Sequence, residues 1–256
     1  MPYVDVGDAR LHVEVDGDGD PVTVLAHGLT NTCRELARIT PMIAGTKVRL
    51  CFRGHGHSTS PDSGYSFADF ARDVEAVATQ YGATRAVGTS LGAGAVCHIL
   101  ARRPDRFERL VFLLPAGLDR PFRHKESFIT TAELLESKPR DEAIDAILSD
   151  RMEAYVRQPW MRRFDREVWD HADLHALATA IREVVEDYPV PHRELLRRVE
   201  APTMLICREG DEIHRAEVGR ILAGIMPNAE LWSYPDDAAL FEALPEIMQR
   251  AGELLA

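Results

Sequence analysis

The stretch Arg85-Ala86-Val87-Gly88-Thr89-Ser90-Leu91-Gly92-Ala93-Gly94 decides the fold of this chain. Its first residues form a short apolar run that is typical of a buried strand, and residues 91–103 have the composition of a helix. Only small residues beside Ser90 permit a sharp turn between the two, because larger side chains would collide with the backbone. The stretch therefore predicts a strand, a strained turn that carries Ser90, and a helix.

A serine at such a turn has the surroundings of a nucleophile. The N-terminus of the following helix directs N–H groups and the positive end of its dipole toward whatever Ser90 holds, which suits a developing oxyanion. A serine hydroxyl alone is a weak nucleophile near neutral pH, so a base must lie within hydrogen-bond reach. The search for further motifs is therefore a search for an acid and a base.

Strand-like and helical segments alternate along most of the chain. Helical spacing occurs at residues 67–81 and 91–103 and after residues 216 and 239. Strand-like runs occur at residues 3–6, 10–15, 22–26, 48–52, 85–88, 110–114, 203–207 and 230–234. This alternation predicts an α/β fold with a mostly parallel sheet that is covered by helices on both faces.

Residues 119–197 interrupt this rhythm. They are rich in charge and predict helices without strands, with the clearest helical periodicity at 133–148 and 174–185. We therefore expect a core made of residues 1–118 and 198–256, with residues 119–197 inserted as a helical lid. The lid is expected to provide walls of a substrate pocket, to which we assign Trp160 and Trp169, together with His27 of the core.

Three motifs now identify a resemblance: the serine turn, His27-Gly28-Leu29 and Gly210-Asp211-Glu212-Ile213-His214. Together they resemble the α/β-hydrolase fold family over nearly the whole chain. The resemblance implies that Ser90 is the nucleophile, that Asp211 is the triad acid, and that Leu29 and Leu91 supply the oxyanion N–H groups. A fourth motif, Arg53-Gly54-His55-Gly56-His57-Ser58, resembles a structural loop of the family. Asp119, after the sixth strand, is a weaker alternative acid.

The family's triad histidine has no counterpart at its usual place. The segment after the last strand aligns that position with Ala238, and the chain contains no histidine after His214. Three explanations remain open. The natural protein lacks the base and uses the pocket otherwise, another histidine serves, or Ala238 is an engineered replacement of histidine.

Several histidines are candidates for the second explanation. His214 lies beside the acid turn, but we interpret it as a surface residue at a helix N-terminus. His27 lies near the serine, but the resemblance implies that it holds loop structure. The remaining candidates belong to the lid and are His124, His171 and His192.

The composition narrows the possible partners. The formal net charge is −11, from 30 basic and 41 acidic residues, which argues against nucleic acid or an anionic membrane surface. The first 15 residues lack the segments of a signal peptide and no apolar run could span a bilayer, so we expect a cytoplasmic protein. A small molecule is the expected partner, and a homodimer stays open.

The cysteines and histidines show no metal-binding spacing. Cys33, Cys51, Cys97 and Cys207 are far apart in the sequence and lie among apolar neighbours, which favours buried free thiols. We therefore expect no metal and no cofactor.

These observations favour a cofactor-free enzyme that acts on a small ester or a related acyl or carbonyl compound through Ser90 and an oxyanion hole. Because the base is missing from its usual place, two alternatives stay open. One is a non-hydrolytic lyase or cyclase, and the other is a hydrolase-like protein that only binds a small molecule.

Overall fold

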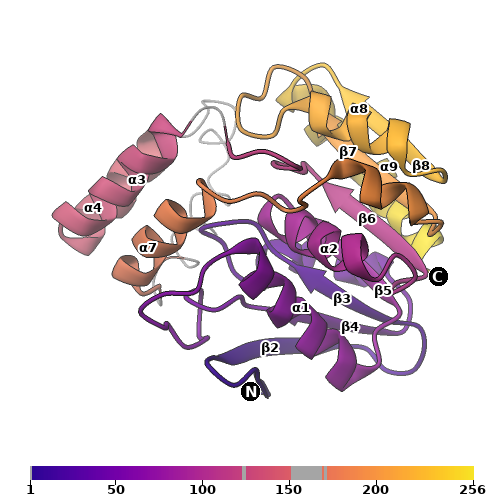
Figure 1. The fold of residues 1–256 in the computed structure, drawn as a ribbon, viewed down its shortest axis with the longest axis horizontal. Helices are drawn as coiled ribbons and strands as arrows, with labels where there is room; N and C mark the ends of the chain where they lie inside the picture. Colours follow the sequence, from indigo (N-terminus) through magenta and orange to yellow (C-terminus); the bar gives the residue numbers. More distant parts are fainter. Residues whose placement is uncertain (1, 123–124, 151–168, 170–171) are drawn as a thin grey trace.

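One eight-stranded sheet forms the centre of the protein, whose computed structural model describes residues 2–122, 125–150, 169 and 172–256 (Figure 1). The strands lie in the order β1-β2-β4-β3-β5-β6-β7-β8. At one edge β1 pairs antiparallel with β2, and β2 pairs antiparallel with β4. Strands β3 to β8 run parallel to one another, so the sheet is mostly parallel, as the sequence predicts. The bounds are β1 Tyr3–Asp5, β2 Arg10–Asp16, β3 Val22–Ala26, β4 Thr46–Leu50, β5 Arg85–Thr89, β6 Arg109–Leu113, β7 Thr203–Arg208 and β8 Ala229–Tyr234.

Helices cover both faces of the sheet (Figure 1). The first face packs against α1 (Phe67–Tyr81), α2 (Leu91–Arg102) and α8 (Ala216–Ile225), and the second against α9 (Asp237–Leu255) and the short helix η1 (Glu35–Arg38). A second short helix, η2 (Thr40–Met42), contacts α9. The helices at 67–81 and 91–103 therefore form within one residue of their predicted bounds.

The apolar runs of the central strands supply the two cores. In β7, Leu205 packs into the core on the α1 and α2 side, whereas Met204 and Ile206 pack into the core beneath α9. All three side chains are at most 4% exposed. Because successive side chains of a strand point to opposite faces, a strand buried on both faces must be apolar throughout, and this is why β7 shows no alternation in its sequence.

The segment between β6 and β7 holds helices and no strand within its described residues. These are α3 (Glu126–Ser137), α4 (Arg140–Asp150), α7 (Leu174–Val184) and the short helix η3 (Arg193–Arg198). The predicted helix at 133–148 is wrong as one element, because the chain breaks at Lys138 and Pro139. Proline disfavours a helical conformation for the residue before it, so Lys138 is extended and α4 starts anew.

Two further sequence expectations can be compared with the structure. All four cysteines are free and buried, as predicted. No helix among the residues that the structure describes is both long and apolar enough to cross a lipid bilayer.

Candidate active site

Ser90 occupies the turn between β5 and α2. Its backbone has φ 49° and ψ −108°, a region that residues with a side chain rarely adopt. The neighbouring glycines make the turn possible: a Cβ at Gly88 would lie 2.6 Å from the backbone nitrogen of Ala93, and one at Gly92 would overlap the carbonyl oxygen of Ala26. This strained turn places the serine at the carboxyl ends of the parallel strands.

His214 is the histidine that meets Ser90. Its Nε2 lies 3.0 Å from Ser90 Oγ, and its Nδ1 lies 3.1 Å from Oδ2 of Asp211. With the carboxylate accepting a hydrogen bond from Nδ1–H, Nε2 is the nitrogen that accepts the proton of the serine hydroxyl. The structure thus joins Ser90, His214 and Asp211 in one hydrogen-bonded chain.

The Asp211 carboxylate is held from several sides. Its Oδ1 accepts the backbone N–H groups of Ile213 and His214 at 2.9 Å and 2.8 Å. Its Oδ2 accepts from the His214 ring and forms an ion pair with Nη2 of Arg208 at 2.7 Å. Burial alone would raise the pKa of Asp211, but its hydrogen bonds and charge interactions with His214 and Arg208 outweigh burial and lower the pKa well below its usual range. Asp211 is therefore an ionised carboxylate.

Arg208 links this carboxylate to the start of α9. Its Nε lies 2.7 Å from Oδ1 of Asp237, the first residue of that helix. Burial raises the pKa of Asp237, and Arg208 opposes this rise. The guanidinium thus bridges two carboxylates, at the side of the site where the family places its histidine. No sequence motif marked Arg208, although an arginine that ends a buried strand one turn before the acid is a signal that could have been used.

The histidine that contacts Ser90 does not come from the position where the family pattern places it. Ala238 is exposed in the first turn of α9, and the histidine in reach of Ser90 comes from the turn after β7. Of the three explanations, the second therefore agrees with the structure. The interpretation of His214 as a surface residue is also wrong, because only 23% of its side chain is exposed and both ring nitrogens have partners.

The turn that follows β3 lies directly beside the serine. The carbonyl of His27 accepts the N–H of Gly92 at 3.1 Å, which joins this turn to the first turn of α2. A Cβ placed on Gly28 would lie 3.5 Å from the Cβ of Ser90. Leu29, the next residue, is partly buried, and Leu91 opens α2. The two residues expected to form the oxyanion hole thus lie on two adjoining turns beside Ser90.

Glu35 holds this turn in place through two hydrogen bonds. Its Oε2 accepts the backbone N–H of Gly28 at 2.7 Å, and its Oε1 accepts the side-chain amide of Asn31 at 2.8 Å. Sequence reasoning did not identify Glu35, which lies seven residues beyond the glycine that it holds.

His27 does not line a substrate pocket as expected. It is fully buried, its Nε2 accepts the N–H of Phe52 at 3.1 Å, and its Nδ1–H donates to the carbonyl of Gly28 at 2.7 Å. Burial and the neighbouring His55 lower its pKa, so the ring stays neutral. Its role is to fix the turn between β3 and Ser90, which agrees with the resemblance.

His55 and His57 belong to the predicted structural loop, and His55 has partners of the same kind as His27. Its Nδ1–H donates to the carbonyl of Arg53 at 2.8 Å, and its Nε2 accepts the N–H of Thr30 at 3.3 Å. His57 is exposed. Burial lowers the pKa of His55 to about 4.

The expected lid residues have different outcomes. Trp169 is 1% exposed and packs into the main hydrophobic core, so it offers a substrate no surface and the pocket assignment is corrected. Trp160, His124 and His171 lie outside the described residues. Among the remaining candidates, His192 precedes η3 and is exposed.

Asp119, the alternative acid, instead forms an ion pair with Arg193 within the segment between β6 and β7. Its two carboxylate oxygens accept Nε and Nη2 of Arg193 at 2.6 Å and 2.7 Å. This pair lines a cleft of about 320 Å³ that also includes Phe122, Glu212 and Ile213. The cleft therefore reaches the two residues that lie between Asp211 and His214.

Comparisons with known proteins agree with this architecture. Residues 52–240 match the model of the alpha/beta hydrolase fold family. A Synechocystis sp. relative that carries a non-heme chloroperoxidase name is 29% identical, with 83% of each chain covered. The pimeloyl-[acyl-carrier protein] methyl ester esterase of Chromobacterium violaceum is 26% identical, with 88% of this chain and 89% of the esterase covered. The enol-lactonase of Burkholderia xenovorans LB400 superposes with a TM-score of 0.82 at 22% identity, over 99% of each chain.

Proposed function

Because this chain belongs to the alpha/beta hydrolase fold family, we propose that it is a serine hydrolase that cleaves small carboxylic esters with Ser90, His214 and Asp211 as its catalytic triad. The observation that carries the proposal is the hydrogen-bonded chain from Ser90 Oγ through the His214 ring to the Asp211 carboxylate. Each member has the environment that its role needs: a strained, presented hydroxyl, an oriented imidazole and an ionised carboxylate.

The first half-reaction forms an acyl-enzyme. Ser90 Oγ attacks the ester carbonyl carbon while its proton moves to Nε2 of His214. The Asp211 carboxylate stabilises the imidazolium that results, since it stays ionised beside Nδ1–H. The tetrahedral intermediate then collapses, the carbon–oxygen bond to the alcohol breaks, and His214 returns its proton to the leaving alkoxide.

The second half-reaction releases the acid. Water gives a proton to Nε2 of His214 and attacks the acyl carbon, and the second tetrahedral intermediate expels Ser90 Oγ, which recovers its proton from the imidazolium. In both steps the backbone N–H groups of Leu29 and Leu91 would hold the oxyanion. The hydrogen bond between His27 and Gly92 supports this assignment, because it joins the two turns on which these N–H groups lie.

Two relatives support an ester as the substrate class. One is named as a methyl ester esterase and one as an enol-lactonase, and both names describe hydrolysis of a carboxylic ester bond. The two alternatives, a lyase or cyclase and a binding protein, were motivated by a missing base. The contact between His214 and Ser90 takes that motivation away.

The test combines covalent labelling with turnover. A fluorophosphonate probe should label Ser90, and p-nitrophenyl acetate should be hydrolysed with a burst of nitrophenol. His214→Ala and Ser90→Ala should each lower kcat by about five to six orders of magnitude, as in other serine hydrolases. The matched control is His175→Ala, which removes an exposed histidine from α7.

Two results would contradict the proposal. Labelling and turnover that persist in His214→Ala would show that His214 is not the base. Turnover of a carbonyl compound that survives Ser90→Ala would favour the lyase or cyclase, in which the oxyanion hole polarises a carbonyl without acylation.

A further inference from the structure

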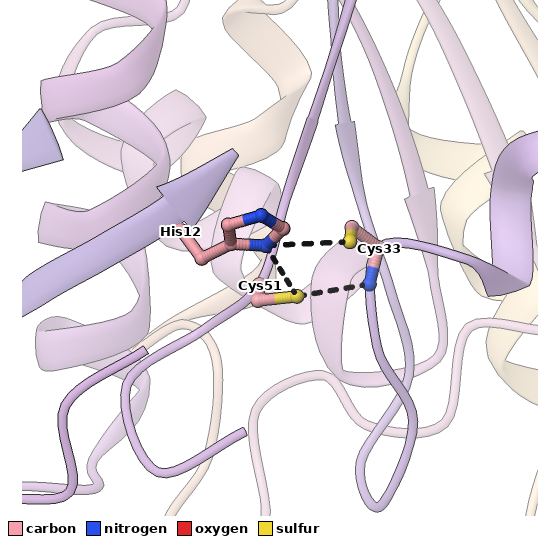
Figure 2. A group of neighbouring side chains, drawn as sticks. All are labelled: His12, Cys33 and Cys51. Carbon is pink, nitrogen blue, oxygen red and sulfur yellow. Dashed lines mark hydrogen bonds between the residues drawn. The ribbon is translucent and has the colours of Figure 1, made fainter. Parts of the chain in front are cut away.

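A second group of reactive side chains lies apart from the triad, in the interior beside the first strands. His12 is on β2, Cys33 follows the turn that begins at His27, and Cys51 follows β4 (Figure 2). Their exposed fractions are 1%, 3% and 1%. The proposed hydrolysis uses none of the three, so their convergence at one point requires its own explanation.

The three ligand atoms have the spacing of a metal site. Nδ1 of His12 lies 3.8 Å from Sγ of Cys33 and 3.7 Å from Sγ of Cys51, and all three atoms lie within 4.8 Å of one another. An ion bonded at about 2.3 Å to sulfur and about 2.0 Å to nitrogen holds the sulfur and the nitrogen about 3.5–3.7 Å apart, for bond angles between tetrahedral and trigonal. An ion at the centre of the triangle would therefore need little movement of its sulfur and nitrogen ligands.

The backbone fixes two of the ligands relative to each other. The carbonyl of His12 accepts the N–H of Cys51 at 2.9 Å. The hydroxyl of Ser58 accepts the N–H of His12 at 2.9 Å and donates to the carbonyl of Cys51 at 2.7 Å. Such support around ligands pre-forms a site and lowers the entropic cost of binding.

The third ligand is held by hydrogen bonds of its own. The carbonyl of Cys33 accepts Nη1 of Arg49 at 3.1 Å, and its backbone N–H points at Sγ of Cys51 at 3.3 Å. An N–H donated to sulfur favours the thiolate over the thiol, and the thiolate is the metal-binding form of cysteine. The rings of Tyr3 and His57 pack edge-on against His12 and hold its plane.

We propose that His12, Cys33 and Cys51 form a buried structural site for a thiophilic closed-shell cation, Zn²⁺ or Cu⁺. Two sulfurs and one imidazole are the ligand set that such ions prefer over Ca²⁺ or Mg²⁺. Zn²⁺ with two thiolates is electrically neutral, and so is Cu⁺ with one thiolate and one thiol, so either ion avoids leaving a net charge in the interior. The thiol protons that the ion displaces are released to solvent.

Sequence spacing does not reveal this group, because its members come from three separate segments. Cys33 is 21 residues from His12, and Cys51 is 18 residues further along. Binding would tie the turn that carries Leu29 to β2 and β4. No hydrogen bond among the described residues joins His12, Cys33 or Cys51 to the triad, so a bound ion would stabilise this part of the fold without taking part in the reaction.

The first experiment measures metal content. The chain is produced without a histidine tag, purified under a non-chelating reductant, and analysed by mass spectrometry for zinc and copper. About one equivalent per chain is expected, and Cys33→Ser and His12→Gln should each lose it. The matched control is Cys97→Ser, which removes an equally buried thiol from α2 and should keep the metal. Equal metal content in Cys33→Ser and the unaltered chain would overturn the proposal.

The second experiment does not depend on the variants folding. Chain unfolded in denaturant with chelator is refolded with one equivalent of Zn²⁺, Cu⁺ or Co²⁺. Retention of the ion after gel filtration, with a sulfur-to-cobalt charge-transfer band for Co²⁺ and a raised Tm, is expected; the ion retained most strongly identifies the occupant. Refolded chain that binds none of the three ions would overturn the proposal. So would chain that has lost two hydrogens to a Cys33–Cys51 disulfide and contains no metal. Esterase turnover, measured in parallel, reports separately on the triad.

Discussion

Asp211 and His214 stand three residues apart in one turn, and the ring of His214 reaches from the Asp211 carboxylate to Ser90. The proposed acid and base therefore come from the same end of β7, two strands away from the strand that presents the serine. The position after β8, where the family pattern places its histidine, holds Ala238. Its neighbour Asp237 binds Arg208 instead.

Arg208 forms an ion pair with Asp211, and we propose that it positions the triad through this carboxylate. Arg208→Met should lower kcat by about one to two orders of magnitude, the equivalent of one charge-assisted hydrogen bond, with little change in KM. Without the guanidinium the Asp211 pKa should also rise, because one of the interactions that lower it is gone. Steady-state kinetics across pH on p-nitrophenyl acetate measures both effects. Arg220→Met, which alters an exposed arginine of α8, should change neither.

A histidine at the family position should not replace His214 in this chain. In the double variant His214→Ala with Ala238→His, the new ring would start from an exposed position on α9, and Arg208 already occupies the nearby face of Asp211. Esterase activity should therefore stay at the level of His214→Ala alone. Recovery of activity by the second substitution would show that both positions can serve the same serine.

The pair of Asp119 and Arg193 should control access more than stability. Both groups are partly exposed, and an ion pair of this kind contributes about 0–1 kcal/mol to folding, so Arg193→Ala should lower Tm by only a few degrees. KM should rise with kcat unchanged, because the pair lines the cleft beside Glu212 and Ile213. Arg197→Ala provides the comparison, since Arg197 pairs on the exposed face of the same short helix. Equal KM values for the two variants would contradict this role.

Neutral buried histidines should make the fold sensitive to mild acid. His55 has a pKa lowered from 6.5 to about 4, so between these values the unfolded chain binds a proton that the folded chain excludes. The free energy of unfolding should therefore fall as pH decreases from 6.5 to 4, with His55 contributing up to about 3 kcal/mol of the loss. Asp211 acts in a separate window: its lowered pKa stabilises the fold above the unfolded carboxyl pKa, and this stabilisation is lost only at lower pH.

Denaturant titrations at several pH values test the histidine effect. His55→Gln should show a shallower decline with acid than the unaltered chain, although its absolute stability is lower. His175→Gln, at an exposed position, should follow the unaltered chain. An unchanged slope in His55→Gln would contradict the assignment.

The local sequence was sufficient to predict the serine turn and much of the sheet. The pattern around Ser90 has few conformations open to it, since Gly88 and Gly92 face backbone atoms that exclude any side chain. The aspartate turn was found for a related reason: Asp211 binds the N–H groups of residues two and three positions ahead, a contact that a short motif can encode. Pro139 carried an equally local signal, and it was missed where the periodicity of residues 133–148 was given more weight.

The contact of His214 with Ser90 and the cysteine group could not be predicted from the sequence, because both join residues from separate segments of the chain. His214 and Ser90 are 124 residues apart and meet only because β5 and β7 flank β6 in the sheet. The sequence analysis placed the histidine by the family pattern, whereas the folded structure determines which histidine lies within hydrogen-bond distance of Ser90. Cys33 and Cys51 likewise meet only where β4 passes beside the turn after β3.

The turn from Asp211 to His214 holds both proposed partners of Ser90 in one short segment. The carboxylate, the imidazole and the N–H groups that orient them lie within four consecutive residues, so one short graft would carry the proposed acid and base together. A relative with a comparable serine turn could receive both in a single exchange, after which its own histidine would be free to change. In such a lineage, the segment after the last strand would be released from catalysis and could diversify toward other tasks.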